Sequence, residues 1–420
     1  MPHRPKALVL TPEMAHQDPR VTWNLEILAR YYAVTIAPGT DCPERGSLGF
    51  YAKHEVLPCG RSRRKGLRHN AVPALRLMLA FPALVWLAAR TAIRQPRAVW
   101  EVVRMFGSRQ THRSWFFSVW RCLKMHAAVW PFIRGNDYDL VWCHEFMTLP
   151  TGLRYQRLHP RCKIVWDEHE IGVIPPLSHC QRLAAEACAG FVSVSDALLE
   201  YQIEALPALR PKAYCVPNVP TIIRPPAFTP GADRIRWIMI GMESPHLVES
   251  LRHFLGVWER HAPRHCTLDC FIMQNTTRSY VRSQAFDSAR VRGVAFHDPL
   301  PADRLADRLR ASDVGIAPYF LDGVFRFACP NKVGEYIHAG LAVLVNDDLE
   351  WYGPVIERFG CGISANLADE EATHRAIALL SDRPTVDGFK RRSCEAARAE
   401  WNYDTAVAPL MARLQDGLSE

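Results

Sequence analysis

Residues 329–345 read CPNKVGEYIHAGLAVLV, and this stretch carries most of the information about the architecture. Pro330 suits the first turn of a helix, where its missing amide hydrogen costs nothing, and Gly340 suits the end of that helix. The apolar run LAVLV that follows is typical of a strand buried on both faces of a parallel sheet. The stretch therefore predicts a helix that leads into a buried strand, which is the repeating unit of an α/β fold.

The same alternation of apolar strands and helical stretches extends outward in both directions. The expected strands lie at residues 7–11, 33–37, 140–144, 163–170, 191–196, 213–218, 236–241, 267–273, 291–296, 313–319 and 341–347. Five prolines between residues 217 and 230 indicate a linker. A chain of 420 residues is also too long for one ordinary core. We therefore expect an α/β fold of two Rossmann-like, doubly wound parallel-sheet domains that face each other across a cleft, with a C-terminal helix that crosses back.

Approximate domain boundaries follow from this alternation. The expected parts are an N-terminal domain at 1–218 with a basic, aromatic helical insertion at about 60–132, a Pro-rich linker at 219–234, a C-terminal domain at 235–386, and helices at 387–420 that pack back toward the N-terminal domain.

The cysteines and the N-terminus indicate a cytoplasmic protein. All 13 cysteines are scattered singly, and MPHRPKALVLT contains no secretory signal, so reduced thiols fit better than disulfides. Cys266 and Cys270 are the closest pair, but no second ligand pair accompanies them. We therefore expect no metal there.

The positive charge of the chain is concentrated in one segment. Residues 51–134 hold 16 Lys and Arg against two Glu, giving +14, whereas the whole chain has a net charge of +8. The apolar core at 77–89 is too short to span a bilayer, but Trp and Phe alternate with Arg from residue 100 to 130. This composition suits the surface of an anionic membrane. Helices that pack in the N-terminal domain with exposed Arg are the alternative, and we expect no nucleic-acid partner because no recognition motif is present.

The expected helix after Pro330 is a candidate phosphate site. Unpaired amides and a partial positive charge at a helix N-terminus attract anions, and Lys332 adds a full charge. Glu335, one turn into the helix, could accept hydrogen bonds from a ribose diol. The site would lie beyond the carboxyl end of the strand at 313–319, where open α/β sheets bind ligands. An ordinary capped helix with a solvated Glu335 is the alternative.

The segment PNKVGEYIHAGLAVLV resembles the donor site of GT-B glycosyltransferases in the large retaining family that builds glycolipids and bacterial polysaccharides, the family 4-like enzymes. Six other stretches resemble that family in the same order: HQDPRV, YDLVWCHEFMTLPTGL, VWDEHE, FVSVSDALLE, VPNVP and FGCGI. The resemblance covers most of the chain except about residues 52–132. It implies a GT-B fold and transfer of a sugar from a nucleotide-sugar donor.

The resemblance also implies site residues. Glu335 would hold the donor ribose, while Lys332 and the amides after Pro330 would face the phosphates. His144 would lie near the reacting sugar, or it caps a strand end, and His169 is a second candidate. The donor-binding set is Glu335, Lys332, Asn331, Arg326 and Gly241; the catalytic candidates are His144 and His169; the acceptor-side candidates are Asp18, Arg20, Glu145 and Glu170. Asp18 and Arg20 contact the acceptor or cap the following helix.

Three positions depart from the family pattern. Phe327 stands where relatives often carry an acidic residue, and GMESPHLVES at 241–250 lacks the basic residues that bind a diphosphate. A glycine-rich turn after the first strand is also missing. Arg326 and Lys332 could substitute for the missing basic residues.

The sequence therefore predicts a glycosyltransferase that acts on an acceptor hydroxyl, with a lipid-linked or polysaccharide precursor as acceptor and peripheral attachment to the cytoplasmic face of a membrane. We expect no metal and no other cofactor, because no carboxylate pair with metal-ligand placement stands out, and the resemblance favours retention at the anomeric carbon. The alternatives are a non-catalytic GT-B protein that binds a nucleotide or glycan, and a nucleotide-sugar epimerase.

Overall fold

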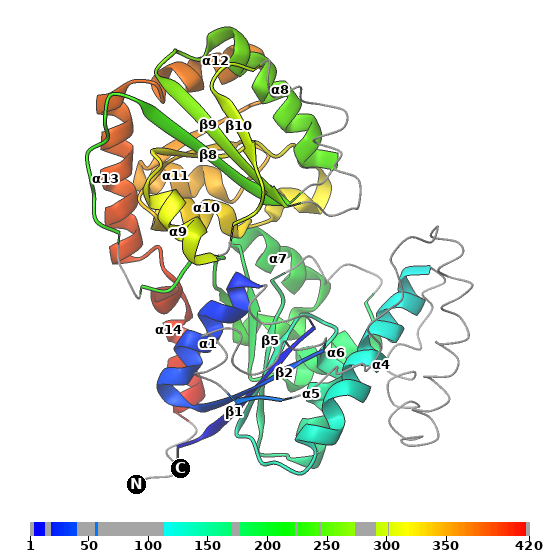
Figure 1. The fold of residues 1–420 in the computed structure, drawn as a ribbon. Helices are drawn as coiled ribbons and strands as arrows, with labels where there is room; N and C mark the ends of the chain where they lie inside the picture. Colours follow the sequence, from blue (N-terminus) through cyan, green and yellow to red (C-terminus); the bar gives the residue numbers. More distant parts are fainter. Residues whose placement is uncertain are drawn as a thin grey trace. The chain divides into compact units, whose positions relative to one another are not determined.

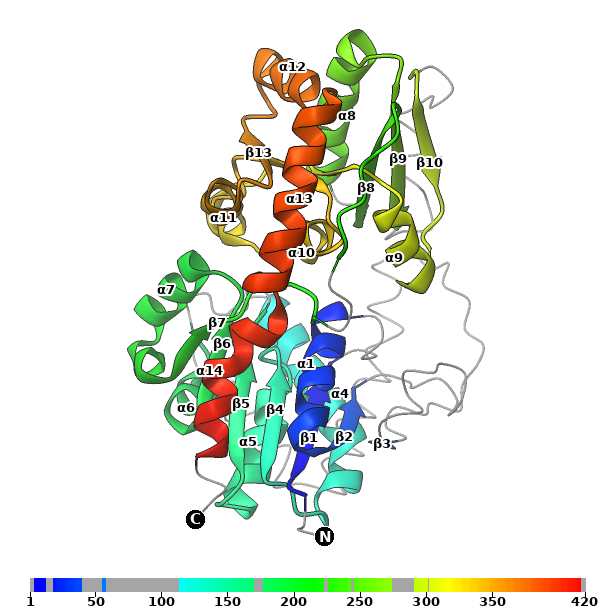
Figure 2. The ribbon, with the colours of Figure 1, turned by 90° about the vertical axis from the view of Figure 1, so that its left-hand side faces the viewer.

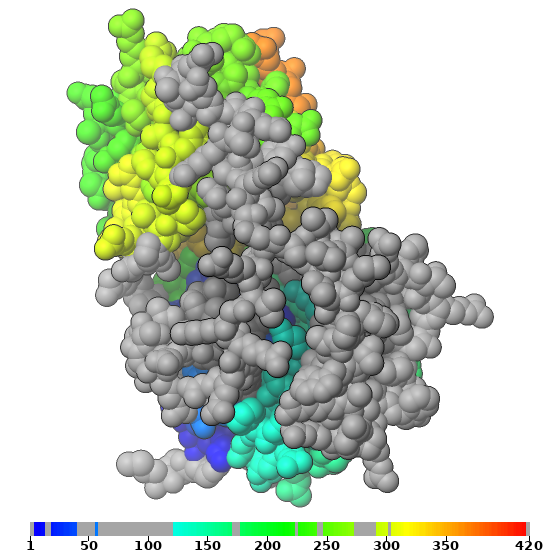
Figure 3. Space-filling view, turned by 45° about the vertical axis from the view of Figure 1, so that its right-hand side comes forward, coloured from blue at the N-terminus to red at the C-terminus, as the bar shows by residue number. Residues whose placement is uncertain are grey.

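The computed structural model describes residues 4–12, 18–39, 55–57, 113–169, 177–222, 226–242, 245–273, 291–300 and 302–416, which are coloured in Figures 1 and 3. The chain divides into two compact units. Unit 1 comprises Met1–Ser193 and Leu199–Tyr214, and unit 2 comprises Val194–Leu198 and Cys215–Glu420. The assignment thus changes from one unit to the other three times along the sequence.

Unit 1 is built on a sheet whose seven described strands have the order β3-β2-β1-β4-β5-β6-β7 (Figure 2). Strand β1 pairs in parallel with both β2 and β4, and β4 pairs in parallel with β5. The strands are β1 (Lys6–Thr11), β2 (Ala33–Pro38), β3 (Glu55–Val56), β4 (Leu140–His144), β5 (Lys163–Asp167), β6 (Gly190–Ser193) and β7 (Ala213–Cys215). Parallel neighbours and crossover helices confirm the predicted doubly wound arrangement.

Helices cover both faces of this sheet. Helix α1 lies on one face, while α4, α5 and α6 lie on the other (Figure 1). The helices of unit 1 are α1 (Pro19–Tyr31), α4 (Arg113–Ile133), α5 (Leu149–Leu158), α6 (His179–Ala187), α7 (Asp196–Ala205), which begins in unit 2, and the 3-10 helix η3 (Pro207–Lys212). Strand β4, LVWCH, is buried at all five positions because helices cover it on both sides.

Unit 2 repeats the plan with six described strands in the order β10-β9-β8-β11-β12-β13. Strand β8 pairs in parallel with β9 and β11, and β12 pairs in parallel with β11 and β13. The strands are β8 (Ile235–Met242), β9 (Cys266–Met273), β10 (Val294–His297), β11 (Val314–Ala317), β12 (Ala342–Asn346) and β13 (Gly362–Ala365). The two parallel sheets together confirm the expected fold class.

The helices of unit 2 also form two layers. Helices α8 and α12 pack on each other, as do α10 and α13. The helices are α8 (Pro245–His261), α9 (Ala302–Arg310), the 3-10 helix η5 (Gly323–Phe327), α10 (Asn331–His338), α11 (Tyr352–Phe359), α12 (Glu370–Leu379), α13 (Arg383–Ala399) and α14 (Tyr403–Gln415). Their apolar faces and the strands form one core, which includes Trp237, Phe254 and Trp258.

Residues 329–345 form the helix and strand that the sequence predicts. Pro330 caps α10, and Gly340 follows its end with a φ of 77°, a left-handed conformation that glycine adopts without strain. Strand β12 follows at once and is buried at all five positions.

The structure describes the expected linker in part and the expected insertion only at its C-terminal end. Residues 219–222 and 226–234 belong to unit 2, and most of the expected insertion at about 60–132 lies outside the described residues. No helix in the described part of the chain is long and apolar enough to cross a membrane. The placement of α13 and α14 against unit 1 stays a prediction.

Candidate functional sites

Each sheet has one place where its strand order reverses. In unit 1 the chain passes from β1 outward to β2 and β3, and later from β4 outward in the opposite direction. The carboxyl ends of the strands at such a point are where open α/β sheets bind ligands. Asp18 and Arg20 follow β1, His144 ends β4, and Asp167 ends β5. The fold therefore gathers these four side chains at one edge.

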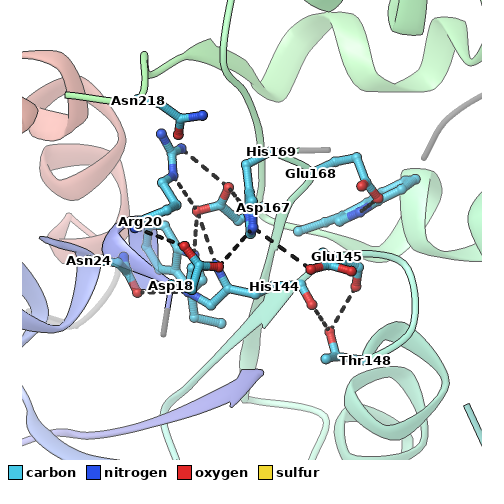
Figure 4. A network of polar contacts seen from close by, with 12 residues as sticks. Asp18, Arg20, Asn24, His144, Glu145, Thr148, Asp167, Glu168, His169 and Asn218 are labelled. Atoms are coloured by element: carbon cyan, nitrogen blue, oxygen red, sulfur yellow. Dashed lines mark hydrogen bonds and ion pairs between the residues drawn. The ribbon is translucent and has the colours of Figure 1, made fainter. Parts of the chain in front are cut away.

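Asp167 is the centre of this cluster (Figure 4). The Arg20 guanidinium donates to both of its carboxylate oxygens, at 3.4 Å from Nε and 3.2 Å from Nη2, and Trp142 Nε1 donates at 3.1 Å. Nδ1 of His169 lies 3.5 Å from Asp167 Oδ1, and Nδ1 of His144 lies 3.7 Å from Oδ2. Burial raises the pKa of Asp167, but Arg20 and the two histidines outweigh it and hold that pKa well below its usual range.

His169 lies between two aspartates. Its Nε2 is 3.1 Å from Asp18 Oδ2 and 3.9 Å from Glu145 Oε1, while its other nitrogen faces Asp167. Burial lowers the pKa of His169, but Asp18 and Asp167 outweigh burial and raise it well above the usual value. The two aspartates therefore favour the protonated form of the His169 imidazole. The Asp18 and Glu145 side chains are 26% and 17% exposed, so they are the accessible members of the cluster.

Asp18 has a second role, because it is the N-cap of α1 and accepts a hydrogen bond from the Arg20 amide at 2.9 Å. Both interpretations of Asp18 from the sequence remain compatible with this position: it caps the helix and also reaches the cluster. Arg20 is buried and ion-paired with Asp167. An acceptor contact by either side chain stays a prediction.

His144 lies deeper than His169. It is fully buried, its Nε2 is 3.3 Å from Asn24 Oδ1, and its ring meets the His169 ring edge-on at 5.5 Å between centroids. Burial, only partly offset by Asp167, lowers the pKa of His144 to about 4. His144 is therefore neutral at physiological pH, in contrast to its neighbour.

Glu145 has a strained backbone. Its φ of 60° is the one positive value among the described residues other than glycine. The Glu145 amide donates to Asp167 O at 2.8 Å and the Thr148 hydroxyl donates to Glu145 O at 3.0 Å, and these bonds hold the conformation. Such strain is frequent at functional sites. Glu170, the remaining acceptor-side candidate, lies outside the described residues.

The same cluster has the spacing of a metal site. His144, Asp167 and His169 can each offer one ligand atom, and these three atoms lie within 4.8 Å of one another. Arg20, however, already binds both oxygens of Asp167, and its positive charge opposes a cation at that carboxylate. We therefore interpret the three residues as a hydrogen-bonded network, and the expectation of no metal stays a prediction.

The second site is at the strand reversal of unit 2, between β8 and β11. The Tyr336 hydroxyl from α10 accepts from the Ile240 amide at 2.9 Å and donates to Ile316 O at 3.3 Å. This buried hydroxyl bridges the two strands beyond their last paired residues, Gly315 and Ile238. Helix α10 is thereby fixed at the carboxyl edge of the sheet, as the sequence predicts.

Glu335 lies on the same helix and is partly buried. Burial raises its pKa to about 7, against the opposing effect of the Lys332 charge. Tyr319 is close enough for Glu335 to raise the pKa of the tyrosine further, after burial. The Lys332 ammonium is 3.4 Å from Asn331 Oδ1, so the first turn of α10 carries a cation and an amide side chain.

The two remaining donor-side candidates lie near this edge. Arg326, on η5, forms an ion pair with Glu350 at 2.7 Å, and both side chains are more than a third exposed. Gly241, near the end of β8, has the Tyr319 hydroxyl 3.5 Å from where its Cβ would be. The structure thus brings Gly241, Tyr319 and Glu335 to the same edge of the sheet.

Sequence reasoning missed three members of these clusters, namely Asp167, Asn24 and Tyr319. Asp167 ends the strand at KIVWD, and a carboxylate at the carboxyl end of a buried parallel strand is a usable signal. Asn24 had no such signal, because an Asn in the middle of a helix is typical of an exposed position. Its contact with His144 depends on how α1 packs on β4.

Comparisons with known proteins now place the fold. No family model and no curated protein matches the chain. A solved sucrose-phosphate synthase from Thermosynechococcus elongatus is similar over 99% of both chains, with 13% identity and a TM-score of 0.63. Trehalose 6-phosphate synthase from Burkholderia multivorans is similar over 99% of both chains, with 12% identity and a TM-score of 0.61.

Anabaena HepE, solved in complex with UDP, is similar over 98% of this chain and 100% of its own, with 13% identity and a TM-score of 0.59. At these identities the likenesses show the fold alone. The chain therefore has the two-domain GT-B fold of glycosyltransferases, as the sequence resemblance implied.

Proposed function

We propose that the chain is a glycosyltransferase that binds a nucleotide-sugar donor at α10 of unit 2 and an acceptor hydroxyl at the Asp167 cluster of unit 1. The observation that carries the proposal is the position of Glu335 and the α10 N-terminus at the strand reversal of a GT-B unit. A half-buried carboxyl group that costs free energy to ionise is best explained by a ligand that donates hydrogen bonds to it, such as a ribose diol.

The donor phosphates would bind the first amides of α10 together with Lys332. A helix N-terminus and a fixed ammonium stabilise the charge of a departing diphosphate without any movement at the moment of reaction. Arg326 can join them, because its ion pair with Glu350 is exposed and such pairs contribute about 0–1 kcal/mol at most. The metal-independence that we predict from the sequence is part of this proposal.

The acceptor would contact the two partly exposed carboxylates of the unit 1 cluster. Asp18 and Glu145 converge on Nε2 of His169, so an acceptor hydroxyl could donate to one carboxylate while His169 fixes its orientation. His144, neutral and fully buried, would position His169 and Asn24. Retention at the anomeric carbon rests on the resemblance alone.

We further propose that the acceptor is a lipid-linked or polysaccharide precursor, and that the basic segment at residues 51–134 attaches the enzyme to the cytoplasmic face of a membrane. The charge of +14 in that segment supports this. Flotation with vesicles that contain anionic lipid checks the attachment, and binding that survives neutralisation of the arginines would contradict it.

The donor site is tested by a thermal-shift panel of UDP, GDP, ADP and CMP with their common sugar conjugates. A ligand at 100 times its Kd should stabilise the protein by about 2.7 kcal/mol. We expect one nucleotide to raise the Tm of the wild type but not of Glu335→Ala. Glu357→Ala, which removes an exposed carboxylate of the same unit, is the matched control and should respond like wild type. No response to any nucleotide in the wild type would refute the proposal.

A nucleotide-binding protein without transferase activity is the second candidate. It is favoured by the missing basic residues after β8 and by the pairing of Arg326 with Glu350. Sugar release from the donor that binds, measured by chromatography with a panel of glycan and glycolipid acceptors, separates the two. Tight nucleotide binding with no turnover would support this second candidate.

A further inference from the structure

The loop that enters α10 is fixed by three side chains that lie outside it, two of them more than 100 residues away in the sequence. Its carbonyl groups at Phe327, Cys329 and Pro330 each accept a hydrogen bond from one of them. We propose that the three donors, Ser195, Asn218 and Tyr352, are positioning residues that preorganise the phosphate site at the N-terminus of α10. This inference rests on the proposed function of that site.

Asn218 makes the closest connection. Its side-chain amide donates to Cys329 O at 2.8 Å, and its main-chain amide is 3.4 Å from Cys329 Sγ. On the other side, a Cβ at Gly334 would lie 2.2 Å from Asn218 O, so only glycine lets this segment approach the first turn of α10. Asn218 therefore contacts the start of α10 on two sides, through the loop before it and through its first turn.

Tyr352 and Ser195 complete the set. The buried Tyr352 hydroxyl, at the start of α11, donates to Pro330 O at 3.0 Å. The fully buried Ser195 donates to Phe327 O at 2.7 Å, and its oxygen accepts from the Leu198 amide at 3.2 Å. Ser195 lies in FVSVSD and Asn218 in VPNVP, two stretches that carried the family resemblance without any assigned role.

The direction of these bonds gives the physical reason. A peptide group points its carbonyl and its amide in opposite directions, so the Tyr352 bond to Pro330 O fixes the orientation of the Asn331 amide, the first of α10. The Cys329 carbonyl precedes Pro330, which has no N–H, so the bond from Asn218 holds the position of the loop and does not orient an amide. Groups that are held in place before the ligand arrives bind it without the ordering cost that a loose loop would have. The three bonds would therefore appear in donor affinity as well as in stability.

The experiment uses the full chain and the nucleoside diphosphate, among UDP, GDP and ADP, that binds the wild type. Asn218→Ala, Tyr352→Phe and Ser195→Ala each remove one of the three donors. Calorimetric titration should show Kd raised about tenfold for Asn218→Ala and Tyr352→Phe, because each loss frees one peptide of the loop. With a productive acceptor, KM for the donor should rise more than kcat falls.

Ser393→Ala is the matched control, because the buried Ser393 hydroxyl also donates to a main-chain carbonyl in unit 2, Leu341 O, at 2.6 Å. We expect it to lower the Tm of the unliganded protein as much as Ser195→Ala does, with Kd within twofold of wild type. Loss of Tm without any change in Kd in Asn218→Ala and Tyr352→Phe would overturn the inference and leave the proposed function standing. Absence of nucleoside diphosphate binding in the wild type would overturn both.

Discussion

Glu335 is a carboxyl group whose proton should report on the donor. Burial raises its pKa to about 7, so at pH 6 the neutral form predominates in the free protein. A ribose diol that donates to the carboxylate favours the charged form, and binding should therefore release most of one proton at pH 6. Calorimetric titration in buffers of different ionisation enthalpy measures this number directly.

Glu335→Gln is the control for that measurement and should release no proton at this site. Because its pKa is raised, Glu335 stays protonated to a higher pH in the folded chain than in the unfolded chain. The free energy of unfolding should therefore fall as pH rises from about 4.5 to about 7. The Gln variant should lack that decline. Equal proton release by the variant and the wild type would remove Glu335 from the donor site.

His169 should keep its proton at neutral pH because of Asp18. We expect the ring resonances of His169 in an NMR titration to change well above pH 6.5, and Asp18→Asn to move that change to lower pH. Asp137→Asn removes an exposed carboxylate near His159 in the same unit and should leave His169 unaffected. A titration of His169 that Asp18→Asn does not move would contradict the geometry of the cluster.

At the residue scale the sequence predicts some side chains and misses others. Glu335 and Lys332 can be nominated from the sequence because motif and helix are contiguous, and their role in donor binding stays a prediction. The central position of Asp167 was not predicted, because its main partner, Arg20, is 147 residues away in the sequence. The two residues meet only once the sheet has assembled. Local spacing cannot show a contact of that kind.

At the scale of elements, α13 is fastened to the sheet by a buried carboxylate at the start of β11. Asp313 Oδ1 lies 2.8 Å from the Lys390 ammonium and 3.0 Å from Arg383 Nη1. We expect Asp313→Asn to lower the free energy of unfolding by about 3–5 kcal/mol, because it leaves Lys390 buried without its countercharge. Chemical denaturation checks this value.

Two further observations test the same bond. Burial raises the pKa of Asp313, but Arg383 and Lys390 outweigh it and lower that pKa, so its stabilisation is present above about pH 4 and is lost as pH falls further. Glu370→Gln, at an exposed pair with Arg260, should lower the free energy of unfolding far less, because solvent screens that pair. Equal losses in the two variants would show that burial of Asp313 does not matter.

The elements themselves were largely predictable. The strand at 140–144 is confirmed to the residue, since a turn and an apolar run mark it sharply. The strand expected at 191–196 is wrong at its end, because β6 stops at Ser193. The hydroxyl of Ser195 caps the next helix instead, as its bond from the Leu198 amide shows.

At the scale of the whole molecule, the two parallel sheets could be predicted because central strands such as β4 and β12 are buried at every position and read as apolar runs. The division of the chain between the two units could not be predicted from the sequence. Val194–Leu198 belongs to unit 2 although it follows β6 of unit 1, and no composition change marks it. Its assignment depends on contacts such as that of Ser195 with Phe327 O, which link residues 132 positions apart.

The loop before α10 should tolerate changes of its own side chains. Ser195, Asn218 and Tyr352 all bind main-chain carbonyls, which every amino acid provides. Substitutions at 327 can therefore accumulate while the helix start stays in place. A different side chain at position 327 would change the chemistry next to the start of α10 without removing the bond that Ser195 makes to its main chain.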